Sequence, residues 1–358
     1  MENKHRLKIG LLGDICVVKD AYKVMQDKGA KVFAKSVFES VDDCDLIIAN
    51  LEAPVTDSQT SREKKQYNLQ HTPDVLDIFD NRFAITIANN HMMDFGEEGL
   101  ADTITALNSK QIDFSGAGKN IESAGKVIIK QVNNYNVAII CAADPRSNPA
   151  TIDTAGTYPA DTKVITATIK SLIVKVDLII VTVHAGIEFV SIPSPFQQSF
   201  AEKCHEAGAA IVQYHHTHCI SGISKTDESI TFLGSGNFIF PYVLPKGFKP
   251  WFKTASWVVE YDFETKKLSH EIRPLTINSD GIPERMNDED RILFLQKVEK
   301  ISQKVQLRKN LSRLRLLDML KPIYLKFSLI HYYQIARERG VRAMLATIIN
   351  GFRSQFTK

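Results

Sequence analysis

Short apolar runs recur along the chain, and each run is bounded by polar residues. Their length of four to six residues and their content of Ile, Val and Leu are typical of buried β-strands. We therefore expect a strand at each of these runs. They fall at 8–12, 46–49, 84–88, 136–141, 178–183, 209–212 and 230–233.

Several segments between these runs show the three- and four-residue spacing of helices. The clearest are 99–108 and 196–207, and Gly208 follows the second at the position where a helix ends. The runs 257–263 and 268–272 flank a short polar segment and predict a hairpin. Because strands and helices alternate, the predicted fold class is α/β, with some antiparallel pairing at the end of the core.

After residue 283 the pattern changes to helical spacing over a long stretch. One apolar stripe is backed by Lys and Arg. The stripe consists of Ile292, Leu295, Val298, Ile301, Val305, Leu311, Leu314, Leu317 and Leu320. Pro322 should end this helix, and further helical segments follow at 323–339 and 341–349. We therefore divide the chain into a core domain, 1–283, and a basic amphipathic helical extension, 284–358.

Composition excludes several classes of protein. The chain has 358 residues, of which 44% are hydrophobic and 24% charged, which excludes disorder and fibres. Five cysteines without a C-x-x-C pair exclude a disulfide framework and a zinc knuckle and indicate a reducing compartment. The basic segment 4–8 leads into a first strand that Asp14 interrupts, so we predict no signal peptide. Apolar runs fall short of the roughly 18 residues of a membrane span, and we expect a cytoplasmic protein.

Charge divides the chain unevenly. From Lys300 to Lys358 there are thirteen Lys or Arg against Asp318 and Glu338, a net charge of +11, so residues 1–299 carry −8. The extension suits the anionic inner face of a membrane or a membrane-bound synthase, with Tyr332, Tyr333, Phe352 and Phe356 near its end. The alternative is that its apolar stripe packs on the acidic body. No nucleic-acid partner is expected, since the basic residues lack the aromatic interleaving of a known module.

Polar residues suited to metal binding follow most of the predicted strands. They are Gly13-Asp14, Asn50-Leu51-Glu52, Asn89-Asn90-His91 with Asp94, His184 with Glu188, His215-His216-Thr217-His218, and Gly236-Asn237. In an open α/β sheet the carboxyl ends of the strands open into one crevice, so these side chains can converge from distant parts of the chain. Carboxylates, amide oxygens and imidazoles bind divalent Mn, Fe, Zn or Mg.

The individual signals differ in strength. Asp14 or Glu52 alone carries little weight, and a single His184 after an apolar strand is more often a hydrogen-bonded structural residue. His216 and His218 carry more weight, because residues two apart on extended backbone point to the same side. Because several such segments occur together at strand ends, the metal-site hypothesis is much stronger for the whole set than for any single residue in it.

The polar segments also form a recognisable pattern. Asn89-Asn90-His91-Met92-Met93-Asp94-Phe95-Gly96-Glu97-Glu98-Gly99-Leu100, followed by Gly116-Ala117-Gly118-Lys119-Asn120, resembles the signature of the bacterial capsule synthesis protein family of CapA type. That family is associated with poly-gamma-glutamate capsules. The likeness continues through His184-Ala185-Gly186-Ile187-Glu188-Phe189, His215-His216-Thr217-His218 and Gly236-Asn237-Phe238. It covers roughly 8–275 and leaves the extension outside.

This resemblance implies a calcineurin-like metallophosphoesterase fold, a β-sandwich flanked by helices with a dinuclear metal site at its edge. It implies that Asp14 and His218 bind the first metal and that Glu52 bridges both. Asn90, His184 and His216 would complete the second site, and His91 would donate a proton to the leaving oxygen without binding metal. The other residues expected to line the site are Asn50, Asp94, Glu188, His215 and Asn237.

The chain departs from the pattern of this superfamily in three places. Cys16 stands where a histidine is usual, and its thiolate is a possible ligand, although burial as a small apolar side chain is the favoured interpretation. Glu52 replaces the usual bridging aspartate. Ala185 and Thr217 replace a tryptophan and a proline, and neither change removes a ligand.

Two functions remain open at this stage. The first is a metal-dependent hydrolase, with two divalent ions, acting on a phosphoester-like or acyl intermediate of capsule or surface-polymer synthesis. The second is a non-catalytic assembly factor that uses the same fold to bind the polymer or its synthase. A measured metal content and a measured hydrolytic rate distinguish them.

Overall fold

The computed structural model describes residues 5–61, 68–241 and 249–308. Most of the basic extension, including the helices expected at 323–339 and 341–349 and the four aromatic residues near its end, lies outside the described residues. The boundary at residue 283 stays a prediction. Within the described part of the chain, no helix is both long enough and apolar enough to cross a membrane.

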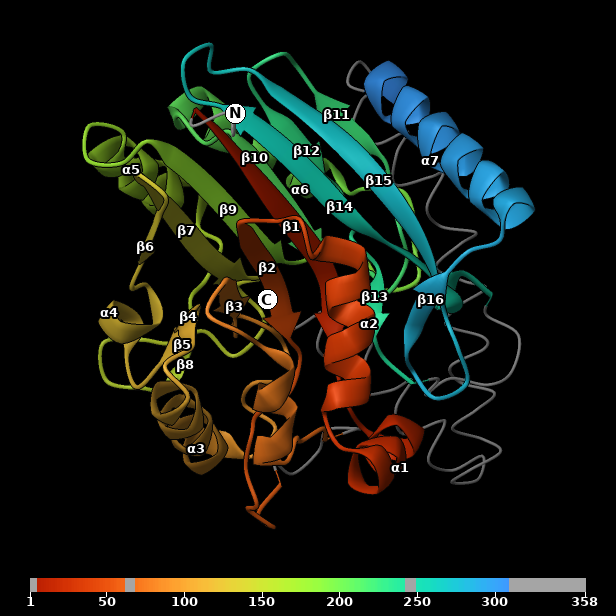
Figure 1. Ribbon diagram of the computed structural model, residues 1–358. Helices are drawn as coiled ribbons and strands as arrows, with labels where there is room; N and C mark the ends of the chain where they lie inside the picture. The colour runs from red at the N-terminus through yellow and green to blue at the C-terminus, as the bar shows by residue number, and fades with distance from the viewer. Residues whose placement is uncertain (1–4, 62–67, 242–248, 309–358) are drawn as a thin grey trace, which may run out of the picture. The chain divides into compact units, whose positions relative to one another are not determined.

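The first sheet has the order β16-β15-β14-β1-β2-β3-β4, and β13 pairs with the end of β1 (Figure 1). Strands β1 to β4 and β13 run parallel, whereas β14, β15 and β16 form an antiparallel extension beside β1. The strands are β1 Arg6–Ile15, β2 Leu46–Leu51, β3 Phe83–Thr86, β4 Asp113–Ser115, β13 Asn237–Ile239, β14 Lys253–Asp262, β15 Leu268–Ile277 and β16 Pro283–Arg285.

The second sheet has the order β11-β12-β10-β9-β7-β6. Its four central strands are parallel, and an antiparallel strand closes each edge. The strands are β6 Ile128–Val132, β7 Tyr135–Ala143, β9 Leu178–His184, β10 Ile211–His215, β11 Ile223–Lys225 and β12 Ile230–Phe232. A separate two-stranded pair joins β5 Ala117–Gly118 to β8 Gly156–Thr157.

The two sheets pack face to face because their strands alternate between two apolar faces. Leu7, Ile9 and Leu11 of β1 face the same core as Ile139 of β7 and Ile180 of β9. Residues at the intervening positions face outward, as period-two geometry requires. The outward residues of each sheet form a separate core with the helices, so every central strand is buried on both faces.

Helices cover both outer faces of the sandwich. Those packed on the first sheet are α1 Lys19–Lys28, α2 Lys31–Val41, the 3₁₀-helix η1 Pro73–Ile78 and α3 Gly96–Ser109. Those packed on the second are α4 Ile121–Ala124, α5 Thr162–Leu172 and α6 Pro195–Ala207. Gly208 ends α6 in the left-handed conformation, as predicted. The α/β class and the helix-flanked β-sandwich are confirmed.

The helix α7, Asp288–Arg308, packs its apolar side on the sandwich. Phe294 and Val298 are buried in the core between the sheets, and Val305 joins the outer core of the second sheet. The backbone N–H of Ile223 also donates a 2.8 Å hydrogen bond to Ser302 Oγ. For this first helix of the extension, the apolar stripe therefore packs on the body.

Three expectations about local structure were wrong in detail. The strand expected at 84–88 ends at Thr86, and the helix expected after residue 283 begins only at Asp288, because the short strand β16 occupies 283–285. Ile292 was expected in the buried stripe but is 55% exposed. The stripe begins instead at Phe294, which lies one helical turn before Val298 and so shares its face.

Candidate metal centre

The cluster of polar residues lies where strands of both sheets end. Asp14 is on β1, and Glu52 directly follows β2 in the first sheet. His184 and His215 are the last residues of β9 and β10 in the second sheet, and the two strands place them side by side. Convergence at strand ends was predicted for one open sheet. The residues come instead from the strand ends of two packed sheets.

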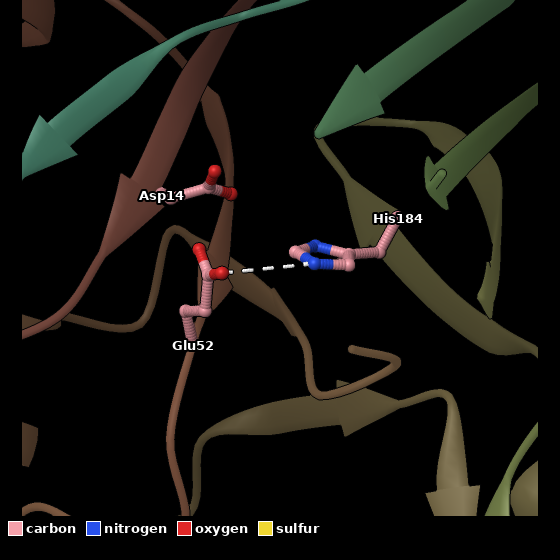
Figure 2. Close-up of side chains that lie close together, drawn as sticks. All are labelled: Asp14, Glu52 and His184. Carbon is pink, nitrogen blue, oxygen red and sulfur yellow. Dashed lines mark ion pairs between the residues drawn. The ribbon is translucent and has the colours of Figure 1, made fainter. Parts of the chain in front are cut away.

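Asp14, Glu52 and His184 form the centre of the cluster. One ligand atom of each lies within 4.8 Å of the other two, and all three residues are buried. Figure 2 shows the two carboxylates on one side and the His184 ring pointing toward them from the other. Two carboxylates buried together repel each other unless a positive charge or strong donors compensate, so this arrangement suits a cation.

Two asparagines hold the carboxylates in place. Asn50 Nδ2 donates a 2.8 Å hydrogen bond to Asp14 Oδ1 and lies 3.5 Å from Glu52 Oε2. Asn89 Nδ2 donates to Asn50 Oδ1 at 3.1 Å and to the Leu51 carbonyl at 2.8 Å. Asn89 thereby fixes the orientation of the Asn50 amide, which points its NH₂ group at both acids. The sequence analysis noted Asn89 in a motif but gave it no role.

Three potential ligand atoms lie around His184 Nε2. Asn90 Oδ1 lies 2.8 Å away, His216 Nδ1 3.1 Å and Glu52 Oε1 3.7 Å. Metal bonds of about 2.0–2.2 Å place neighbouring ligands about 2.8–3.6 Å apart. The spacing of these side chains therefore fits ligands of one metal ion, and they are the four residues that the resemblance assigns to the second metal.

His218 is the least centrally placed of the expected ligands. Its Nδ1 lies 3.6 Å from Asp14 Oδ2, and its Nε2 lies 3.7 Å from Glu52 Oε1. Nδ1 also lies 2.8 Å from Asn237 Oδ1, which accepts the hydrogen bond. Asn237 is brought there by β13, whose register pairs it with Asp14.

Aromatic rings enclose His218, and the sequence analysis missed them. Trp251 and Phe240 place their ring centres 5.0 and 5.2 Å from that of His218, and Phe189 lies at 5.9 Å. Trp251 Nε1 donates to the Phe240 carbonyl at 3.3 Å, which fixes its own position. No local pattern marks these residues, because they come from three separate segments that meet only in the fold.

His215 binds the buried acid from the opposite side. Its Nδ1 lies 3.0 Å from Asp14 Oδ1 and donates to it. Burial acts to raise the pKa of Asp14, but interactions led by the hydrogen bond from His215 outweigh burial and hold that pKa well below its ordinary value. Asp14 is therefore kept as a carboxylate, the form that binds metal.

The imidazole of His184 is held neutral. Burial is the main cause that lowers its pKa well below the ordinary value, and the neighbouring His216 ring adds to the effect, whereas Asp14 opposes it. A neutral imidazole is the form that coordinates metals. The protonation of Asp14 and that of His184 therefore both favour a bound cation.

His91 lies outside this set and pairs with Asp94. Its Nδ1 is 2.7 Å from Asp94 Oδ2, and the carboxylate is 1% exposed while the imidazole is 12% exposed. Asp94 Oδ2 also accepts the backbone N–H of Leu69 at 2.8 Å. A carboxylate that orients an imidazole at the edge of a site is the arrangement expected for a proton donor.

The cluster has a buried part and a partly exposed part. We call the buried set the floor, and its members are between 0 and 5% exposed. The floor consists of Asp14, Glu52, His184, His215 and His218. We call the partly exposed set the rim, which consists of Asn90, His91 and His216.

The backbone around His216 and His218 differs from the expectation. Extended backbone was predicted, but β10 ends at His215, and both residues have left-handed φ angles of 81° and 52°. Such angles are costly for residues with a side chain and concentrate at functional sites. The premise of the two-residue spacing argument was therefore wrong, although the bend still keeps the two ring centres 6.3 Å apart.

Gly13 allows the strand that carries Asp14 to approach its neighbour. A Cβ at Gly13 would lie 2.1 Å from the Gly236 carbonyl oxygen, which accepts the Asp14 backbone N–H at 3.1 Å. Only glycine fits this contact. The Gly-Asp pair in the sequence thus reflects close packing of β1 against the loop before β13.

Two expected site residues differ from the rest. Cys16 is fully buried, and burial, followed by the charges of Glu52 and Asp14, raises the pKa of its thiol well above the ordinary value. This favours its interpretation as a small apolar side chain. Glu188 is exposed, in the loop between β9 and α6.

Comparison with known proteins agrees with the motifs. A family model described as bacterial capsule synthesis protein PGA_cap matches residues 8–242. A PGA biosynthesis protein CapA of Bacillus subtilis is 28% identical over 299 residues, covering 78% of this chain and 76% of the relative. A capsule biosynthesis protein CapA of Bacillus anthracis is 28% identical over 252 residues, covering 66% and 61%.

Solved structures with a similar chain path include two described as enzymes. A novel phosphatase of Mycoplasma pneumoniae has a TM-score of 0.49 at 18% identity, covering 81% of this chain and 96% of that one. A 5′-nucleotidase precursor of Thermus thermophilus has a TM-score of 0.43 at 15% identity, covering 82% and 59%.

Proposed function

The chain belongs to the bacterial capsule synthesis protein family PGA_cap, and from this premise we propose that it is a metal-dependent hydrolase of a phosphoester-like or acyl substrate in capsule or surface-polymer synthesis. The observation that carries the proposal is the buried cluster of Asp14, Glu52 and His184, with Asn90 and His216 at ligand spacing around it.

The donor set suits two divalent metals. Asp14, Glu52 and His218 would hold one, and Glu52, Asn90, His184 and His216 would hold the other. The chemistry that such metals supply when bound is activation of water and stabilisation of negative charge at the reacting centre. Mixed oxygen and imidazole ligands suit Mn, Fe, Zn or Mg.

The protein's own residues divide the remaining tasks. The floor keeps its acids charged and away from water, and the Asn50–Asn89 pair fixes their orientation. His91, oriented by Asp94, stands at the solvent side and delivers a proton to the leaving group. The rim is therefore where the substrate meets the protein.

The charge of the body also bears on the proposal. Residues 1–299 carry a net charge of −8, so the body alone repels a polyanion. Cations bound at the floor reverse the field locally, which lets an anionic polymer intermediate approach. All five cysteines are buried and free, which supports a reducing, cytoplasmic location, and the extension would place the enzyme at the inner face of the membrane.

The first test is metal content. Protein purified without chelator should contain at least one divalent metal, and the double variant His216→Ala with His218→Ala should lose it, because it removes one ligand from each proposed site. Metal analysis by mass spectrometry checks this. Unchanged metal content in the double variant would reject the site assignment.

The second test is turnover. A panel of generic phosphoesters and acyl esters is offered to the metal-loaded protein, with the double variant as the matched control. Metal-dependent hydrolysis supports the proposal. Stoichiometric metal without any hydrolysis favours the alternative, a non-catalytic assembly factor that binds the polymer or its synthase.

A further inference from the structure

A rigid turn follows β7 at the edge where the metal centre lies. Ala143, the last residue of β7, is in register with His184, and the backbone N–H of Asp144 donates to the His184 carbonyl at 3.0 Å. The Ser147 backbone N–H donates to the Asp144 carbonyl at 2.8 Å, which closes a four-residue turn. Pro145 occupies its second position, where the fixed φ of proline stiffens it.

This turn places an arginine at its third position. Arg146 Nε and Nη2 donate to the two carboxylate oxygens of Asp144 at 2.9 and 2.7 Å, and its backbone N–H donates to Asp144 Oδ1 at 2.9 Å. The Asp144 side chain is 17% exposed, whereas the Arg146 side chain is 82% exposed. The carboxylate therefore orients one edge of a guanidinium whose bulk faces solvent.

Backbone hydrogen bonding ties this turn to the metal cluster. The Asp144 N–H donates to the carbonyl of His184, and His184 Nε2 lies 2.8 Å from Asn90 Oδ1 and 3.1 Å from His216 Nδ1 of the rim. Arg146 thus carries a positive charge on a turn that adjoins the cluster of buried acids.

We propose that Arg146 binds the anionic group of the substrate, a phosphate or a carboxylate, at the rim of the metal centre. A guanidinium is planar, always charged and suited to two parallel hydrogen bonds with either group. The Asp144 pair and Pro145 preorganise it, which lowers the entropy lost when the anion binds. That the bound anion belongs to a substrate of the enzyme rests on the proposed function.

The chain offers a matched control in a second turn of the same construction. Arg82 Nε donates to Asp80 Oδ2 at 3.0 Å, its backbone N–H donates to Asp80 Oδ1 at 2.9 Å, and the Phe83 N–H closes the turn on the Asp80 carbonyl at 3.1 Å. That turn precedes β3, at the amino end of the strand. The two arginines share their pairing with an aspartate, but Arg82 lies at the amino end of a strand in the other sheet, is 25% exposed and also donates to the Asp42 carbonyl.

The test measures anion binding and not turnover, so it is independent of whether a substrate is ever hydrolysed. Inorganic phosphate and, separately, glutarate are titrated by calorimetry into manganese-loaded wild-type protein, Arg146→Met, Arg146→Lys and Arg82→Met. We expect Arg146→Met to weaken binding of one of the anions at least about 10-fold. The affinity of Arg146→Lys should be intermediate, because lysine keeps the charge but lacks the two parallel N–H donors of the guanidinium. Arg82→Met should match wild type.

Comparison of the two anions identifies the chemical group that Arg146 binds. A loss confined to phosphate identifies a phosphoryl group, and a loss confined to glutarate identifies a carboxylate. Wild-type affinity for both anions in Arg146→Met would overturn the inference, as would a wild-type protein that binds neither. Loss of manganese from Arg146→Met would also overturn it, because the arginine would then support the metal site itself. If the anions bind as expected but the protein hydrolyses no ester of the panel, the proposed function is contradicted and the assignment of anion binding to Arg146 stands.

Discussion

The floor and the rim use the same residue types in different surroundings. Imidazoles occur in both, but His184, His215 and His218 of the floor are nearly inaccessible, whereas His91 and His216 of the rim are partly exposed. Each floor imidazole lies near a buried carboxylate. His91 instead has its own carboxylate, Asp94, which lies outside the metal cluster.

The difference shows how one cluster can separate holding a cation from exchanging protons. Removal of water strengthens every charge interaction in the floor and keeps His184 neutral, while the hydrogen bond from His215 keeps Asp14 charged. A group that must exchange protons with substrate and solvent needs access to both, and only the rim has it. Changes at the proposed ligands of the floor, and at the ligands Asn90 and His216 of the rim, should therefore remove metal, while a change at His91 should lower the rate.

The largest effect is expected from a change in the floor. Glu52→Gln keeps the shape of the side chain but removes the charge shared between the two proposed sites. Removing a residue that only hydrogen-bonds to a metal ligand already lowers metal affinity by about 10–100-fold. Because Glu52→Gln changes a proposed ligand itself, we expect it to lower the affinity at least about 100-fold. Metal titration followed by mass spectrometry measures it.

Its matched control is the same substitution on an exposed helix. Glu97→Gln on α3 should keep the full metal content, because that residue lies in the exposed first turn. Full metal occupancy in Glu52→Gln would contradict the floor as the metal-binding part of the cluster.

A change at His91, the rim residue that is not a proposed ligand, should affect rate alone. His91→Ala should keep its metal and lower the hydrolytic rate on the best substrate of the panel by about 10²-fold or more, the range for a lost general acid. Steady-state rates on samples of equal metal content measure this. An unchanged rate would assign proton delivery to a water molecule and leave His91 with a structural role.

A separate effect, on stability and not on metal or rate, concerns the buried imidazole of His71. His71 Nε2 accepts the backbone N–H of Val17, and burial lowers the pKa of His71 from 6.5 to about 3. In the unfolded chain His71 therefore binds a proton below pH 6.5, whereas in the folded chain it stays neutral down to about pH 3. The contribution of neutral His71 to the free energy of unfolding is fully present above pH 6.5. Between pH 6.5 and about 3 it decreases by about 1.4 kcal/mol for each pH unit of acidification.

Comparison with a variant isolates this contribution from that of the metal ligands. His71→Gln retains an acceptor for Val17 but cannot be protonated. Urea unfolding of both proteins at several pH values should give a shallower loss of stability between pH 6.5 and 4 in the variant. Equal slopes would show that His71 takes up its proton without unfolding the protein.

Much of the fold was predictable because the signals are local. Continuous apolar runs identify strands buried on both faces, and the central strands of both sheets follow them. Short edge elements were missed, since three residues such as those of β13 or β16 carry too little pattern. Two-face burial also hides which sheet a strand joins, so the sandwich of two sheets was expected from the family resemblance and not from the apolar runs.

The sequence by itself determined which residue types stand at the strand ends, because chain direction and strand length are local properties. It thereby identified Asp14, Glu52, Asn90, His184 and the histidines after β10. Only the tertiary structure decided which of them meet. Asn237 reaches His218 through the pairing of β13 with β1, and the rings around His218 come from separate loops. Asp144 and Arg146 also follow a strand, but their position beside His184 depends on the register of β7 with β9. Contacts between segments far apart in the chain depend on how the sheets pack, which no local periodicity encodes.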